Sequence, residues 1–161
     1  MVGTRARRRQ RLLRRFRAHP GEPQPRGHRS TSDVALVVLD LNQDGWPDFL
    51  VSRNNDETLA FRNNGVAGRK SVRVSLRGPA GNRDAIGARI TVELTDGSAM
   101  SSEVYAGSGY YSQSSAACFF GYSEANAPRE VRVRWPSGAT TRDEFPPGSS
   151  SLVVTPPGPV Q

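Results

Sequence analysis

The sequence contains few residues that bind metals through sulfur or act as bases near neutral pH. Its 161 residues include one cysteine, Cys118, and two histidines, His19 and His28. A single thiol excludes an internal disulfide and any cysteine-clustered zinc or iron–sulfur site. Both histidines precede residue 33, so the rest of the chain has no imidazole to act as a general base. This excludes a Ser-His-Asp catalytic system after residue 32.

Long hydrophobic runs are also absent. The longest clean run covers residues 34–39, whereas a membrane-spanning helix needs about 20 apolar residues. Hydrophobic residues make up 35% of the sequence, and 16 Gly and 12 Pro interrupt them. This composition is typical of short strands joined by turns. The sequence therefore predicts an all-β fold without a transmembrane segment.

Positive charge is concentrated at one end of the chain. The net charge is +7, but residues 1–32 hold ten Arg and a single acid, Glu22, so this arm carries +9 and residues 33–161 carry −2. Such composition predicts a disordered Arg-rich arm over residues 1–32, with a tether to nucleic acid or an anionic membrane as the alternative. No signal peptide is visible, because no stretch of about 7 to 15 apolar residues follows the arginines. The slightly acidic remainder gives no reason to expect specific nucleic-acid binding.

Oxygen-bearing side chains recur at alternate positions after the first apolar run. They occupy positions 1, 3, 5 and 9 of residues 40–48, and Gly45 at position 6 permits a sharp turn. A hard cation such as Ca²⁺ takes about six to eight oxygen ligands, including a backbone carbonyl at position 7 of such a loop. A plain hairpin turn at Asp44-Gly45 is the alternative. We expect a calcium site formed by Asp40, Asn42, Asp44, Trp46 and Asp48.

The residues on either side of this loop exclude an EF-hand. Position 12 is Val51 where an EF-hand needs Glu, and residues 34–39 and 49–52 are predicted strands rather than helices. Together with residues 59–65, the loop resembles one integrin-type FG-GAP or VCBS repeat. The resemblance implies that residues 33–66 form one blade of a β-propeller, with calcium bound between its strands.

A single blade is incomplete, because repeat units bury their faces only against neighbours. The sequence has no second acidic loop of this kind. We therefore expect the chain to be the C-terminal fragment of a longer propeller-containing protein or a truncated gene product. Alternatively, the blade leans on the module that follows it.

A second module is predicted from residue 67. Apolar and polar residues alternate over residues 71–76 and 88–94, and further strands are expected at 99–105, 117–120, 130–135 and 151–155. Short strands separated by Gly and Pro turns indicate a β-sandwich or a partly open barrel. We expect Val131, Val133 and Trp135 to face its core.

Four segments of this module carry a resemblance to a known family: residues 82–90, 107–114, 120–121 and 131–138. Their order and spacing resemble the ASPIC/UnbV domain, which follows VCBS-type repeats in proteins similar to cartilage acidic protein and in many bacterial secreted proteins. The resemblance implies a β-sandwich-like ASPIC/UnbV domain over residues 67–157, followed by a tail at 158–161. It also implies an extracellular or cell-surface location and no established catalytic activity.

A polar segment and an aromatic segment of this module are candidates for ligand binding. Exposed aromatic rings beside amides suit sugar rings or the loops of a partner protein. An equally weighted alternative places Tyr110 in the core and makes Arg83 and Asp84 a local ion pair. The candidate residues are Asn82, Arg83, Asp84, Tyr110, Tyr111 and Gln113.

The sequence offers no strong catalytic group. Cys118 lies among apolar residues, which predicts a buried thiol with a raised pKa. A hydrolase that uses Asp84 or Glu103 in a carboxylate pair is a weaker alternative. We expect a non-enzymatic, calcium-binding interaction or adhesion module of the extracellular type, with a protein or glycan ligand. The alternative function is an accessory, carbohydrate-binding or carbohydrate-active protein of a bacterial secretion or natural-product pathway.

Overall fold

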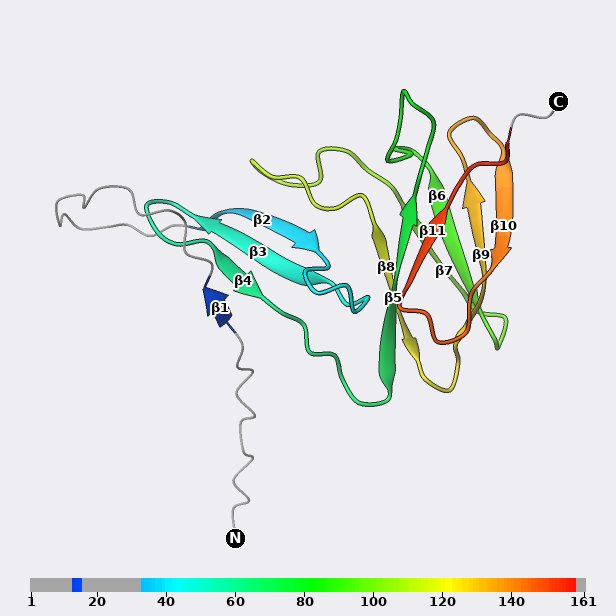
Figure 1. Ribbon diagram of the computed structural model, residues 1–161, viewed down its shortest axis with the longest axis horizontal. Coiled ribbons are helices and arrows are strands. Elements are labelled where there is room, and N and C mark those ends of the chain that lie inside the picture. Colours follow the sequence, from blue (N-terminus) through cyan, green and yellow to red (C-terminus); the bar gives the residue numbers. More distant parts are fainter. Residues whose placement is uncertain (1–12, 16–32, 159–161) are drawn as a thin grey trace, which may run out of the picture.

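The computed structural model describes residues 13–15 and 33–158, and every regular element in these ranges is a β-strand. Eleven strands form three sheets (Figure 1). Within the described ranges, no helix has the length and apolarity needed to cross a membrane. The prediction of an all-β fold is confirmed. The strands are β1 (Leu13–Arg15), β2 (Asp33–Leu39), β3 (Asp48–Arg53), β4 (Leu59–Phe61), β5 (Arg69–Leu76), β6 (Arg89–Leu94), β7 (Ala99–Glu103), β8 (Cys118–Ser123), β9 (Pro128–Arg134), β10 (Thr140–Glu144) and β11 (Ser151–Val154).

The first sheet is antiparallel, with the strand order β1-β4-β3-β2. The acidic loop, residues 40–48, joins β2 to β3, and Leu39 faces Asp48 across the resulting hairpin. Figure 1 shows this sheet lying beside the other two rather than between them. Strands β2, β3 and β4 cover the segment for which a propeller-type blade is predicted.

The other two sheets pack face to face around one core. Their strand orders are β11-β5-β8 and β10-β9-β6-β7, and only β11 and β5 run parallel among their described pairs. Alternate residues of each strand point inward, because successive side chains lie on opposite faces of a sheet. The buried apolar core consists of Val72, Val74, Leu76, Ala85, Ala88, Ile90, Val92, Leu94, Val104, Cys118, Phe120, Val131, Val133, Trp135, Phe145 and Val154.

The core positions predicted from the alternating pattern are confirmed. Val131 and Val133 are fully buried, and Trp135 is 2% exposed. The Trp135 indole Nε1–H donates a hydrogen bond to the Thr141 hydroxyl at 3.0 Å. This bond provides a partner for the N–H of a ring that is otherwise enclosed by apolar groups.

Two strands differ from the sequence-based expectation. β10 consists of polar residues with no apolar alternation, and it forms because its backbone pairs with β9 over five residues. β1 lies inside the arm predicted to be disordered, where Leu13–Arg15 pairs with β4, and the disorder of the arm stays a prediction. A strand edge presents unpaired backbone groups that another segment can bond. The rest of the arm, residues 1–12 and 16–32, lies outside the described residues.

Two hydrogen bonds join the first sheet to the sandwich along the free edge of β2. Val38 donates its backbone N–H to the Ser114 hydroxyl at 3.1 Å, and its carbonyl accepts the amide of Ser115 at 2.9 Å. Both serines belong to the long loop between β7 and β8. This loop therefore covers part of a strand edge that would otherwise present unpaired backbone groups.

Candidate functional site

The acidic loop lies where the first sheet meets the sandwich. Gly45 has a φ of +85°, and a β-carbon added there would lie 2.5 Å from the Ser150 carbonyl oxygen and 2.9 Å from that of Ser71. Such distances are too short for any side chain, so the loop backbone touches the main chain of β5 and of the segment before β11. Glycine is required at this position both for its conformation and for this close approach.

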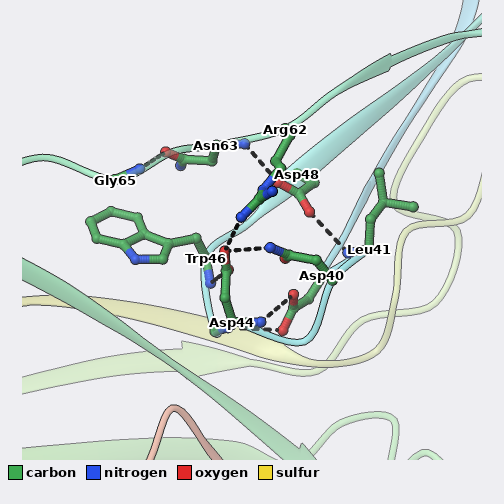
Figure 2. A network of polar contacts seen from close by, with 10 residues as sticks. Asp40, Leu41, Asp44, Trp46, Asp48, Arg62, Asn63 and Gly65 are labelled. Carbon is green, nitrogen blue, oxygen red and sulfur yellow. Dashed lines mark hydrogen bonds and ion pairs between the residues drawn. The ribbon is translucent and has the colours of Figure 1, made fainter. Parts of the chain in front are cut away.

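Asp40 holds the turn of the acidic loop (Figure 2). Its Oδ1 accepts the amide of Asp44 at 3.1 Å, and its Oδ2 accepts the amide of Gly45 at 3.0 Å. The side chain is 1% exposed, and Arg73 of β5 brings its Nη1 to 4.0 Å from Oδ2. A buried carboxylate needs such donors and positive charge, because an unpaired charge away from water is strongly unfavourable.

Asp48 connects the acidic loop to the segment that follows β4. The side chain is fully buried, its Oδ2 accepts the amide of Leu41 at 2.9 Å, and its Oδ1 accepts the amide of Asn63 at 2.7 Å. The Asn63 side-chain oxygen in turn accepts the amide of Gly65 at 3.0 Å. One carboxylate therefore holds both ends of the β3–β4 hairpin against the loop.

Asp44 and Asn42 lie on the more exposed side of the loop. Asp44 Oδ1 accepts the amide of Trp46 at 2.9 Å. Its Oδ2 accepts the Asn42 side-chain amide at 2.6 Å and lies 3.7 Å from the Arg62 Nη2. The Trp46 ring packs against Gly65, where an added β-carbon would lie 2.9 Å from the ring. Trp46 thus contributes a packing contact that was not anticipated for it.

The loop carries the oxygen atoms that a hard cation prefers, but its acidic side chains do not converge on one point. Carboxylate oxygens keep a second lone pair after accepting one N–H, and Ca²⁺ prefers such oxygens. In the part of the chain that the structure describes, however, no three His, Cys, Asp or Glu side chains converge closely enough to hold one metal ion. Arg62 and Arg73 supply positive charge beside Asp44 and Asp40. The predicted ligand residues share one loop, and calcium binding by them stays a prediction.

The polar candidates of the β5–β6 loop divide into one structural residue and two exposed ones. Asn82 donates from Nδ2 to the Ile86 carbonyl at 3.0 Å and accepts the Ile86 amide at 2.9 Å, so its side chain closes the loop. Arg83 and Asp84 are exposed and line a depression of about 670 Å³ next to β5 and β11. Within the described ranges no ion pair joins Arg83 to Asp84, so the alternative that they form a local ion pair is wrong.

The aromatic candidates of the β7–β8 loop are exposed. Tyr110 and Tyr111 are 76% and 80% exposed, with edge-to-face rings 4.4 Å apart between centroids. The alternative that Tyr110 belongs to the core is wrong. Gln113 is used within the loop, because its Oε1 accepts the amide of Gly107 at 2.5 Å and its Nε2 donates to the Ser114 carbonyl at 3.0 Å. The two candidate groups therefore lie on different loops, and no hydrogen bond or ion pair among the described residues joins them.

The side chains considered for catalysis are buried, bonded to other residues or carried by different elements of the fold. Cys118 is buried, and burial raises the pKa of its thiol, which confirms the prediction made from its apolar neighbours. Glu103 accepts the Tyr105 hydroxyl at 2.6 Å and lies 3.7 Å from the Arg89 guanidinium. Asp84 lies on the β5–β6 loop, whereas Glu103 ends β7.

Sequence reasoning missed the basic and amide groups that complete the acidic loop. Arg62 and Asn63 directly follow β4, inside the segment that resembles the repeat, so their position in that motif was an available signal. Arg73 gave no such signal, because it belongs to a strand of another sheet.

The fold and the loop define a class of protein: a β-sandwich that carries a small antiparallel sheet, with an acidic loop at the contact between them. The family model described as "ASPIC and UnbV" matches residues 78–160, slightly more than half of the 161-residue chain. The chain belongs to this family. The match begins after β5, although β5 contributes Val72, Val74 and Leu76 to the core. No curated protein matches the chain.

We expect Gly45→Ala to destabilise the protein more than Gly97→Ala. The φ angles of +85° and +82° strain an alanine at both positions, by about 1–2 kcal/mol. At Gly97 an added β-carbon meets nothing within 4 Å, whereas at Gly45 it meets two carbonyl oxygens, and such overpacking costs a further 1–3 kcal/mol or so. Urea unfolding measures both free energies. Equal losses at the two sites would contradict the packing of the loop on the sandwich.

Proposed function

We propose that this member of the ASPIC and UnbV family is a non-enzymatic interaction module of the extracellular type, whose acidic loop binds Ca²⁺. The observation that carries the proposal is the position of the buried carboxylates of Asp40 and Asp48 at the junction of the first sheet and the sandwich. A cation bound in this loop would stabilise the junction. The extracellular context is supported by the resemblance of the sandwich to a domain found in secreted proteins.

Calcium is favoured over a purely structural turn by the number of acids in the loop. Asp40 and Asp48 accept four of the backbone amides that shape it, and Asp44 accepts that of Trp46. Asp44 adds a third carboxylate, and like charges on one short loop repel each other. Its charged neighbour, Arg62, lies at 3.7 Å with a half-exposed side chain, and such exposed pairs contribute little. A divalent cation relieves this repulsion more effectively, and it has to compete with Arg62 for Asp44.

Ca²⁺ at millimolar concentration should raise the melting temperature of the wild-type chain above its value in a chelator. A ligand that binds only the folded state stabilises it by RT ln(1 + [L]/Kd), about 2.7 kcal/mol at 100 times Kd. Asp44→Asn removes a ligand charge and keeps the shape of the side chain, so the response should disappear. Asp143→Asn, an exposed acid of β10, should keep it. Identical wild-type melts with calcium and with chelator would remove the metal from the proposal.

The first sheet has the features of one propeller-type blade. Four-stranded antiparallel sheets are the units of propellers, and β1 to β4 form such a sheet. Phe49 and Phe61 are direct neighbours across β3 and β4, and they are 41% and 39% exposed. Leu36 of β2, on the same face, is 48% exposed. An exposed apolar face of this kind marks a contact surface, and we take its occupant to be a neighbouring blade of the same type.

The 161-residue chain should self-associate through this face when no neighbouring blade covers it. Sedimentation velocity should show an average mass that rises with concentration, and Leu36→Ser combined with Phe49→Ser should abolish the rise. Val153→Ser is the matched control, because Val153 is 53% exposed on β11 of the sandwich. A wild-type chain that stays monomeric at every concentration would contradict the assignment of this face to a neighbouring blade.

Tyr110 and Tyr111 are the expected contacts of the module with its ligand. Their rings are amphipathic and exposed, and they belong to a loop of the rigid sandwich, where ligand-binding residues are common. Tyr110→Ala combined with Tyr111→Ala should abolish binding to uncharged glycans on an array and leave the melting temperature unchanged. Tyr105→Ala, which removes a tyrosine that is 62% exposed near the end of β7, should retain binding. Full binding by the double variant would exclude the tyrosine pair as the contact.

A further inference from the structure

The outer face of the sheet β10-β9-β6-β7 concentrates arginine side chains. Two of the three arginines of β9 lie on this face, with one from β6 and one from β10, and all four are exposed. Together with two threonines they line a shallow depression of about 810 Å³. We name this surface the arginine face, and it comprises Arg89, Thr91, Arg132, Arg134, Thr140 and Arg142.

The strand register places like charges directly opposite each other on the arginine face. Arg89 of β6 is the register partner of Arg134 on β9. Arg132 of β9 is the register partner of Arg142 on β10. Like charges at directly opposed positions destabilise a sheet. A structural rule that is broken twice on one face indicates that the face serves a purpose other than folding.

Acidic neighbours compensate only the outer arginines. The Arg89 guanidinium lies 3.7 Å from Glu103, and the Arg142 guanidinium lies 3.7 Å from Glu130. For Arg132 and Arg134 of β9, the described residues provide no ion pair. These two guanidinium groups are exposed at the centre of the face, where their donors are available to an external anion.

A row of glutamates borders the arginine face on one side. Glu130 of β9 is the register partner of Glu144 on β10 and of Glu93 on β6. The outer surface of the sheet is therefore divided into a basic part and an acidic row across the same strands. Glu93 and Glu130 are paired with Arg129 and Arg142, but the row would still disfavour an anionic chain relative to the arginines beside it. Such a chain would therefore run across the strands along the arginines.

The chemistry of the lining distinguishes between polyanions. The described residues that line the depression offer guanidinium and hydroxyl groups and no aromatic ring, whereas proteins hold single nucleic-acid strands by stacking bases on aromatic side chains. Guanidinium groups bind oxyanions through two parallel hydrogen bonds. Neighbouring strands are about 4.8 Å apart and alternate residues of one strand about 6.7 Å apart, so a chain that runs across the strands meets two rows of arginines, Arg89 with Arg134 and Arg132 with Arg142. A ligand with more than one charge per sugar ring fits both rows. Sulfate esters supply several charges per sugar, and a uronic acid supplies one.

We propose that the arginine face is a binding site for a sulfated polysaccharide. The chain lies across β6, β9 and β10, with its sulfate groups on the paired arginines and its hydroxyl groups beside Thr91 and Thr140. This site lies on the outward face of the sandwich. It depends neither on metal binding by the acidic loop nor on the tyrosine pair.

The test is titration of the full chain with a heparin oligosaccharide of defined length, followed by backbone amide chemical shifts. The largest shifts are expected on β6, β9 and β10. Arg132→Ser combined with Arg134→Ser should weaken binding at this site by roughly tenfold or more, since each removes a charge-assisted pair. Both arginines are exposed and oppose like charges, so the variant should fold as well as the wild type, which its melting temperature verifies.

Arg69→Ser combined with Arg77→Ser is the matched control, because both are exposed arginines outside the arginine face. All proteins in the series retain residues 1–32 with their ten arginines, so the difference between the two variants isolates the face. The control should bind heparin as the wild type does, and polygalacturonate should bind more weakly than heparin. Shifts confined to other regions, equal losses in both variants, or equal shifts of the face with a single-stranded DNA oligonucleotide would each overturn the proposal.

Discussion

The arrangement of the first sheet depends on hydrogen bonds that backbone amides donate to two buried carboxylates. Asp48 binds the amides of Leu41 and Asn63, and Asp40 binds the turn that contains Gly45. Removing either acid would leave partly buried amides without their acceptors, which costs more free energy than a hydrogen bond contributes. Because the turn is held in this shape, the loop backbone can contact β5 and the segment before β11.

The two parts of the described chain differ in how they bury apolar surface. The sandwich has a core to which both of its sheets contribute, and every residue of that core lies at position 72 or beyond. In the described part of the first sheet, Ala60 is the buried apolar residue, while Leu36, Phe49 and Phe61 remain exposed. The sandwich can therefore stabilise itself, whereas the first sheet depends on its junction with the sandwich and on surfaces that cover its apolar face.

Three surfaces of different chemistry are carried by the sandwich and its junction: the acidic loop, the tyrosine pair of the β7–β8 loop, and the arginine face. The β7–β8 loop also forms hydrogen bonds to β2 through Ser114 and Ser115. One segment therefore exposes the aromatic rings and joins the first sheet to the sandwich. Three distinct surfaces on one β-sandwich support the proposal of a module that interacts rather than catalyses. The acidic loop and the arginine face also differ in the sign of their charge, which would separate the ligands that the two surfaces accept.

The sequence by itself determined the all-β fold, the buried positions of β9 and the acidic loop. Alternation places a residue on a face, and a contiguous loop needs no distant partner. Only the tertiary structure decided what the carboxylates contact, because Asp48 accepts the amide of Asn63 and Asp40 forms an ion pair with Arg73, both from later segments of the chain. It also decided the formation of β10 and the opposition of Arg89 to Arg134. These features depend on strand register, which is set by pairing between segments far apart in the chain and which no local pattern contains.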